Sequence, residues 1–184
     1  MGSEMCIRDR EKDNRDNNYL LDMSWDSYVA MITNVFDAAS QSYTVTGVGE
    51  HGGIFGLDGV KWGTSEGFDL TAYPYDIVLD DEGNTQKVDV DEVKIFKDVL
   101  NGNDKGGEAG VRLGGEKYMV VRRDGKFINL SKKAGGAIIG KAKTCAAIGT
   151  WTSSKADSSG KNQNPGDLQL RLEALVEYLE QQGY

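Results

Sequence analysis

The stretch GGIFGLDGVKWGTS, residues 52–65, decides the fold class because it predicts a tight β-hairpin. Two short apolar runs flank Asp58-Gly59, and the central positions of a type I′ turn need the positive φ that these two residues tolerate. The apolar runs are therefore expected to pair as antiparallel strands. Strict alternation would place Val60 and Trp62 on the same face of the hairpin. The pattern leaves two roles open for Trp62, which are packing in the core and forming a wall at the surface.

The composition fits one globular domain with a sizeable core. The chain has 184 residues, of which 39% are hydrophobic and 27% are charged. A formal net charge of −8 and a pI near 4.7 argue against a nucleic-acid-binding protein, which would show a basic stripe. No apolar run approaches the ~20 residues that cross a bilayer, and no secretory signal follows the start. We therefore expect a cytoplasmic protein.

Residues that could carry chemistry are sparse. His51 is the single histidine, and Cys6 and Cys145 lie in unrelated contexts, so both cysteines are expected to be reduced thiols. The run GVGEHG, residues 47–52, matches the G-x-G-x-x-G motif of a dinucleotide-binding loop. A hairpin follows it instead of the helix whose N-terminus would hold a phosphate. The sequence therefore predicts no enzyme, no cofactor and no metal site.

The order of elements predicts a mixed α/β (α+β) fold. Residues 1–20 are charged and Asn-rich, and we expect them to be a disordered leader or tag before a single domain over residues 21–184. An amphipathic helix is predicted over residues 24–40, with its apolar stripe formed by Trp25, Val29, Ile32 and Phe36. From Gly110 onward, short strands separated by glycine turns predict an antiparallel meander. The last helix is predicted to begin at Asn164-Pro165. Its buried stripe is expected to be Leu168, Leu172, Leu175, Val176 and Leu179.

Two further elements lie between the first hairpin and the meander. Residues 73–90, YPYDIVL and TQKVDV joined by DDEGN, predict an extra β-hairpin, expected to stand outside the core. The segment DVDEVKIFKDVL then predicts a short helix with Asp89 and Glu92 as a capping box. The expected architecture is a central antiparallel sheet of six to seven strands. The two terminal helices would pack together on one face, and the short helix would lie on the other.

These motifs, taken in order, resemble the profilin family. The resemblance is carried by SWDSYV, IFGLDGVKWGTS, GVRLGGEKYMVV, SKKAGGA and NPGDLQ…ALVEYLEQQGY, and it covers residues 24–184. The long hairpin of residues 73–90 is similar to the insertion found in profilins of apicomplexan-type, alveolate-like protists. The Ser-rich loop after Trp151 is longer than is usual in the family, and the leader is not a family feature.

The resemblance implies two binding faces. The first is an aromatic groove for proline-rich segments, because a polyproline II helix is already stiff and loses little entropy when it docks on flat rings. The matching groove residues are Trp25, Tyr28, Trp62, Tyr178 and Tyr184. The second implied face binds monomeric actin, where basic side chains would steer the encounter with an acidic surface. Its matching residues are Lys117, Arg122, Lys132, Lys133, Asn164 and Gln169. For each of these charges, a solvated position in a turn is the alternative.

The function that the resemblance implies is that of a non-catalytic adaptor. It would regulate actin polymerisation by binding actin monomers and formin-like proline-rich proteins, acting as a monomer in the cytoplasm with the cytoskeleton. A weak contact with phosphoinositide head groups is also implied. The alternative is a small-molecule sensor domain of PAS-like architecture, which also has an antiparallel sheet with helices. That alternative requires a ligand cavity inside the domain.

Overall fold

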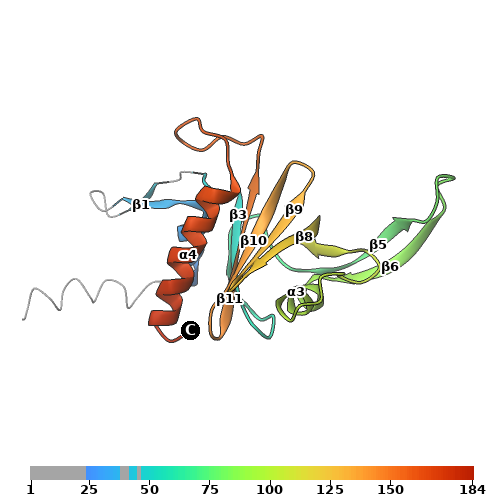
Figure 1. The fold of residues 1–184 in the computed structure, drawn as a ribbon, viewed down its shortest axis with the longest axis horizontal. Coiled ribbons are helices and arrows are strands. Elements are labelled where there is room, and N and C mark those ends of the chain that lie inside the picture. Colours follow the sequence, from blue (N-terminus) through green and yellow to red (C-terminus); the bar gives the residue numbers. More distant parts are fainter. Residues whose placement is uncertain (1–23, 38–41, 45–46) are drawn as a thin grey trace, which may run out of the picture.

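The computed structural model describes residues 24–37, 42–44 and 47–184, so the leader predicted over residues 1–20 and Cys6 lie outside the described residues. One antiparallel sheet forms the centre of the molecule (Figure 1). Its strands are β3 (His51–Gly56), β4 (Lys61–Thr64), β7 (Val111–Leu113), β8 (Glu116–Asp124), β9 (Phe127–Lys132), β10 (Gly135–Lys141) and β11 (Cys145–Thr152). Their spatial order is β4-β3-β11-β10-β9-β8-β7, which confirms the predicted central antiparallel sheet of six to seven strands.

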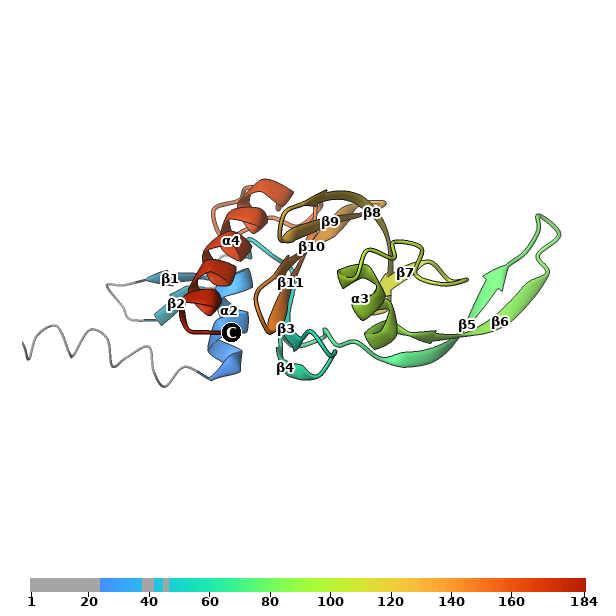
Figure 2. The ribbon, with the colours of Figure 1, turned by 60° about the horizontal axis from the view of Figure 1, so that its bottom comes forward.

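Helices cover both faces of this sheet. They are α2 (Trp25–Thr33), α3 (Glu92–Leu100) and α4 (Pro165–Gln181). Helices α2 and α4 lie side by side on one face, and α3 lies on the opposite face (Figures 1 and 2). This three-layer arrangement confirms the predicted fold. None of the described helices is long and apolar enough to span a membrane.

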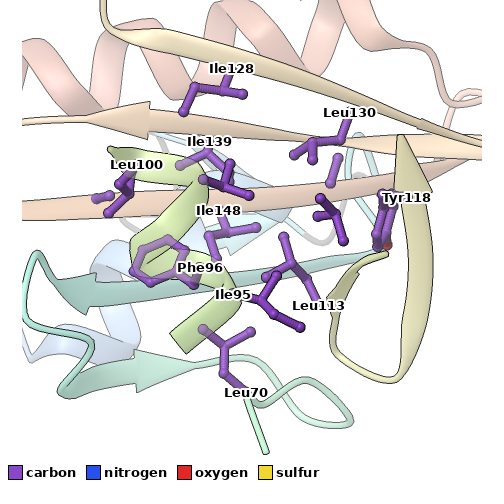
Figure 3. Packing of buried hydrophobic residues seen from close by; sticks show 14 of the residues in the cluster. Leu70, Ile95, Phe96, Leu100, Leu113, Tyr118, Ile128, Leu130, Ile139 and Ile148 are labelled. Carbon is purple, nitrogen blue, oxygen red and sulfur yellow. The ribbon is translucent and has the colours of Figure 1, made fainter. Parts of the chain in front are cut away.

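Two apolar clusters fill the spaces between the layers, because successive side chains of a strand point to opposite faces. In β10, Ile138 packs under α2 and α4, whereas Ile139 packs under α3. Figure 3 shows the cluster under α3, where Phe96 of the helix lies against Ile139 and Ile148 of the sheet. All three of these side chains are fully buried.

The hairpin of residues 52–65 forms as β3 and β4, but its turn differs from the prediction. The Gly59 N–H donates to the Gly56 carbonyl over 2.8 Å, so the turn is centred on Leu57-Asp58. Gly59 follows the turn and carries the positive φ of 90°. The Asp58 carboxylate also accepts from the Val60 N–H at 3.0 Å, a bond to the backbone two residues on that short acidic side chains favour. The predicted type I′ turn centred on Asp58-Gly59 is therefore wrong.

A bulge follows this turn and changes the direction of Trp62. Ile54 pairs with Gly63, whereas the next residue, Phe55, pairs with Lys61. Trp62 is thus the extra residue of β4, and an extra residue bends its strand and re-aims its side chain. Val60 is 57% exposed, so the simple alternation predicted for Val60 and Trp62 does not hold.

The first helix is shorter than predicted. It ends at Thr33, and the next segment forms a separate hairpin of β1 (Val35–Asp37) with β2 (Ser42–Thr44). Phe36 therefore belongs to a strand and not to the apolar stripe of the helix. Beta-branched and aromatic residues such as Val35 and Phe36 favour strands when a partner is available, and Thr44 and Tyr43 pair with them here.

The predicted inserted hairpin is present as β5 (Ala72–Val78) and β6 (Thr85–Asp91), and it projects away from α2 and α4 (Figures 1 and 2). Its distal part is exposed, and Val78 is 69% exposed. At its base, however, Val90 is 2% exposed and belongs to the cluster under α3. The expectation that the whole hairpin stands outside the core is therefore wrong for its base.

The junction between this hairpin and α3 also corrects the predicted cap. The N-cap is Asp91, whose side chain accepts from the Lys94 N–H at 3.0 Å, while Asp89 lies inside β6. Glu92 is not part of a capping box, because it is fully buried and points into the junction. Its carboxylate accepts four hydrogen bonds, from the Tyr73 hydroxyl (2.9 Å) and the backbone N–H groups of Thr71 (3.2 Å), Gly114 (3.0 Å) and Gly115 (2.8 Å). One side chain thus fastens the inserted hairpin and the β7–β8 turn to α3.

The last helix agrees with its prediction in detail. The Asn164 side chain caps α4 by accepting from the Asp167 N–H at 3.0 Å, and Pro165 occupies the first helical position. All five side chains predicted for its apolar stripe are buried.

Candidate functional site

Five aromatic rings gather where the two ends of the described chain meet, beside α2 and α4. We call this set the aromatic groove, and its members are Trp25, Tyr28, Trp62, Tyr178 and Tyr184. The ring centroid of Trp25 lies 4.6 Å from that of Trp62, 5.3 Å from that of Tyr28 and 5.1 Å from that of Tyr184. Tyr178 extends the row, 5.9 Å from Tyr28. These separations are typical of tilted and edge-to-face aromatic contacts, so the five rings form one continuous row, in which Tyr28 is buried and only 7% exposed.

The rings are positioned by several different local features. Trp25 and Tyr28 lie one turn apart at the start of α2, so they share a helix face. Trp62 is directed by the bulge of β4. Tyr178 lies near the end of α4.

Tyr184 is held by backbone hydrogen bonds at the chain end, which Figure 2 shows beside α2. Its N–H donates to the Leu179 carbonyl at 2.9 Å, and its carbonyl accepts from the Lys143 N–H at 3.1 Å. These bonds hold its backbone beside the groove, so the ring can contact both Trp25 and Trp62.

A glycine allows α2 to approach the sheet at the groove. A Cβ at Gly63 would lie 3.0 Å from the Cβ of Trp25 and 3.2 Å from its backbone carbon. That is tighter than ordinary van der Waals contact, so a larger residue at Gly63 would push the first turn of α2 outward. The close contact between Trp25 and Trp62 therefore depends on this small neighbour.

The groove offers both apolar surface and polar atoms. Trp25, Trp62 and Tyr178 are partly buried, and Tyr184 is 37% exposed. The Tyr178 hydroxyl is buried and has no hydrogen-bond partner among the described residues. A buried hydroxyl without a partner is costly, so an acceptor placed against this atom would be favourable. The partial exposure of Trp62 answers the question left by the sequence, because its ring stands at the edge of the core and not inside it.

The six residues matched to the second face do not form one cluster. Met119 pairs with Ser131, so Lys132 and Lys133 lie beside the start of β8, close to Lys117. Lys132 is 3.8 Å from the Glu116 carboxylate and lies over the Tyr118 ring. This group of three lysines occupies one end of the β8–β9 ladder.

Two of the other three matched residues lie around a hollow between that ladder and α4. Arg122 and Gln169 both line this hollow, which has a volume of about 820 Å³. Arg122 is five residues from Lys117, or about 16 Å along an extended strand. It also forms an ion pair with Asp124, and Gln169 donates to Glu173 at 2.9 Å. The second face is therefore broad, with cations at both ends of β8.

Asn164 stands apart from the rest because it already has a structural role. Its side chain caps α4 and also donates to the Asp167 carboxylate at 2.7 Å. A residue whose amide makes both bonds within the protein has little capacity left for a partner.

Comparison with known proteins adds to this geometry. The family model described as Profilin matches residues 23–184. A profilin from Tetrahymena pyriformis is 32% identical over 165 residues, covering 87% of this chain and 98% of that protein. The chain belongs to the profilin family.

Two solved structures show the same fold at lower identity. Acanthamoeba castellanii profilin IA superposes with a TM-score of 0.58 at 23% identity, covering 88% of this chain and 100% of that chain. Mouse profilin IIa, solved in complex with a double repeat from the FH1 domain of mDia1, has a TM-score of 0.52 at 18% identity with the same coverage.

Family membership settles two questions that the sequence left open. Profilins are non-enzymatic actin-binding proteins, which confirms that the chain is not an enzyme. The alternative of a PAS-like sensor domain loses its support, because the profilin model accounts for nearly the whole chain. The described residues contain no group of three His, Cys, Asp or Glu side chains arranged to hold a metal ion.

Two exposed apolar residues lie among those matched to the second face, and the sequence analysis did not single them out. Met119 is 70% exposed and Val121 is 58% exposed, and both lie on β8 between Lys117 and Arg122. A register shift between Val120 and Arg122 makes Val121 the extra residue of the strand. The hydrophobic pattern of EKYMVV predicts a strand, but it does not show that α4 leaves this part of the sheet uncovered.

Proposed function

We propose that this chain is an adaptor that binds proline-rich segments in the aromatic groove and actin monomers on the face formed by β8, β9 and α4. It thereby regulates actin polymerisation, acting as a monomer in the cytoplasm with the actin cytoskeleton. The observation that carries the proposal is that rings from the two terminal helices, from the last residue and from β4 are in contact with one another. Family membership supports the same conclusion.

The groove suits a polyproline II helix for physical reasons. Such a helix has no internal hydrogen bonds, so its carbonyls are free to accept from indole N–H and tyrosine hydroxyl groups. Its proline rings pack against flat aromatic faces in a groove of this kind. The unpartnered Tyr178 hydroxyl is the donor that we assign to a peptide carbonyl. The complex of mouse profilin IIa with an FH1 repeat supports a peptide ligand for this fold.

The second face combines an apolar centre with charged ends. Met119 and Val121 supply exposed apolar area, and Lys117 and Arg122 stand at either end of it. Interfaces of this composition have a desolvated centre and a polar rim, in which the rim charges govern the rate of encounter. We assign actin binding to this face, and we assign Asn164 a capping role only.

Removal of one hydroxyl tests the groove. Tyr178→Phe should weaken the binding of a proline-rich peptide by about tenfold, since a peptide carbonyl would lose its hydrogen-bond donor, with folding unaffected. Isothermal titration calorimetry measures the affinity, and thermal melting checks the fold. Tyr75→Phe, on the inserted hairpin, is the matched control and should bind as the unmodified chain does. Equal peptide affinity for Tyr178→Phe and the unmodified chain would remove the hydroxyl from the site.

A further inference from the structure

A hollow of about 760 Å³ lies at the base of the inserted hairpin, and neither proposed binding face includes it. Its walls come from the segment between β4 and β5, from β5 itself and from the β7–β8 region. Tyr73 and Tyr75 of the hairpin form one side, and Arg112 of β7 reaches it from the sheet. The insertion thus helps to build a cavity that opens beside a cationic side chain.

Arg112 is in an unusual state. It is only 7% exposed, although arginine is seldom buried without a partner. Its neighbours Val111 and Leu113 face the core, so alternation along β7 points the guanidinium to the opposite side, under the hairpin. The guanidinium lies 3.8 Å from the centre of the Tyr75 ring. Its Nε and Nη1 atoms are buried and have no hydrogen-bond acceptor among the described residues.

The nearest buried acid does not supply the missing acceptor. Both oxygens of the Glu92 carboxylate already accept from neutral donors, two hydrogen bonds each. The ring of Tyr75 attracts the guanidinium through its π-face, but a ring face does not accept in-plane N–H bonds as an oxygen does. Arg112 therefore keeps two donor nitrogens without an acceptor, and its side chain lines an open hollow.

We propose that this hollow binds a carboxylate group, held by the guanidinium of Arg112. The guanidinium presents two parallel N–H groups along either edge, from Nε with Nη2 or from Nη1 with Nη2, and each pair matches the two oxygens of a carboxylate. The Tyr75 ring fixes the plane of the guanidinium. A singly charged ligand fits better than a phosphate, because Glu66 also lines the hollow and repels a second negative charge, while the carboxylate of Asp69 is paired with Lys61. The carboxylate comes either from a free organic acid or from an acidic side chain of a partner.

Nuclear magnetic resonance of the full ¹⁵N-labelled chain tests this assignment. The Nε–Hε signal of Arg112, identified by its loss in Arg112→Lys, is followed during addition of sodium acetate, of a capped glutamate peptide, of inorganic phosphate and of sodium chloride. We expect the acetate or the glutamate peptide to shift this signal saturably, and the tighter of the two identifies the source of the carboxylate. Backbone amide signals of residues 64–71 should shift with it.

Two variants distinguish recognition by the planar guanidinium from attraction by a positive charge alone. Arg112→Lys keeps the positive charge but loses the planar pair of donors, so the backbone shifts should then require about tenfold more carboxylate. Arg122→Lys, on the far face, is the matched control and should leave the titration unchanged. Shifts that chloride reproduces at equal ionic strength, tighter binding of phosphate than of acetate, or no saturable shift of the Arg112 signal in the unmodified chain would each overturn the proposal.

Discussion

Replacing Glu92 by glutamine should destabilise the fold strongly. The carboxylate accepts four hydrogen bonds in a fully buried site, two at each oxygen. Glutamine keeps one acceptor oxygen and places an NH₂ group where the other stood, so two buried donors lose their acceptor. Each unsatisfied donor costs about 1–3 kcal/mol, which gives a loss of about 4 kcal/mol in the free energy of unfolding. In a domain of this size, that loss lowers Tm by about 8–16 °C.

Guanidinium chloride unfolding, followed by circular dichroism, measures this loss. Glu177→Gln is the matched control, because Glu177 is exposed on α4 and its substitution should change the free energy of unfolding by less than about 0.5 kcal/mol. A free energy of unfolding for Glu92→Gln within about 1 kcal/mol of that of the unmodified chain would contradict this reasoning. It would mean that the four hydrogen bonds do not fasten the hairpin to the fold.

Three further predictions concern the two faces and one ion pair. Trp25→Ala and deletion of Tyr184 should each weaken proline-peptide binding by ~2 kcal/mol in calorimetry. A double-mutant cycle should show non-additive losses because the two rings touch. Additive losses would place the rings in separate sites. Lys117→Glu combined with Arg122→Glu should slow actin association and make it less salt-dependent, while peptide binding stays unchanged. If this double variant acts like the unmodified chain in a pyrene-actin assembly assay, the actin-binding face is misplaced. Burial alone would raise the pKa of Glu50, but hydrogen bonds from Lys155 and Thr152 outweigh this effect and lower the pKa below 4.5. The ionised carboxylate therefore stabilises the fold above that pH and loses its contribution as the pH falls through the folded value. Thermal melts should show a gap between the unmodified chain and Glu50→Gln at neutral pH that closes on acidification; a gap constant with pH would contradict this.

The elements that the sequence predicted well are those fixed by neighbours in the chain. Helix α4 has its cap at Asn164, its proline at the first position and its leucines at helical spacing, so all the information is local. Helix α2 has a similar apolar spacing, but it ends early because Val35 and Phe36 pair with a strand several residues later. That competition between a helix and a hairpin is decided by pairing partners, and periodicity alone cannot weigh it.

The aromatic groove could be predicted as a set of residues but not as a geometry. The resemblance named all five rings, and the fold brings them into contact. The bulge that directs Trp62 depends on a register shift between β3 and β4, which the sequence does not display. The burial of Glu92 and Arg112 was not predicted, for another reason. Charged residues are expected at the surface, and it is the packing of the inserted hairpin and the β7–β8 region that buries these two.

Tryptophan fluorescence during addition of poly-L-proline tests the central claim most directly. The chain has three tryptophans, and Trp25 and Trp62 lie in the groove while Trp151 lines the hollow beside Arg122. Binding in the groove should change the emission saturably, and Trp151→Phe should retain the full change. A folded chain whose emission does not respond, or whose response disappears with Trp151→Phe, would contradict the assignment of the aromatic groove as a proline-binding site.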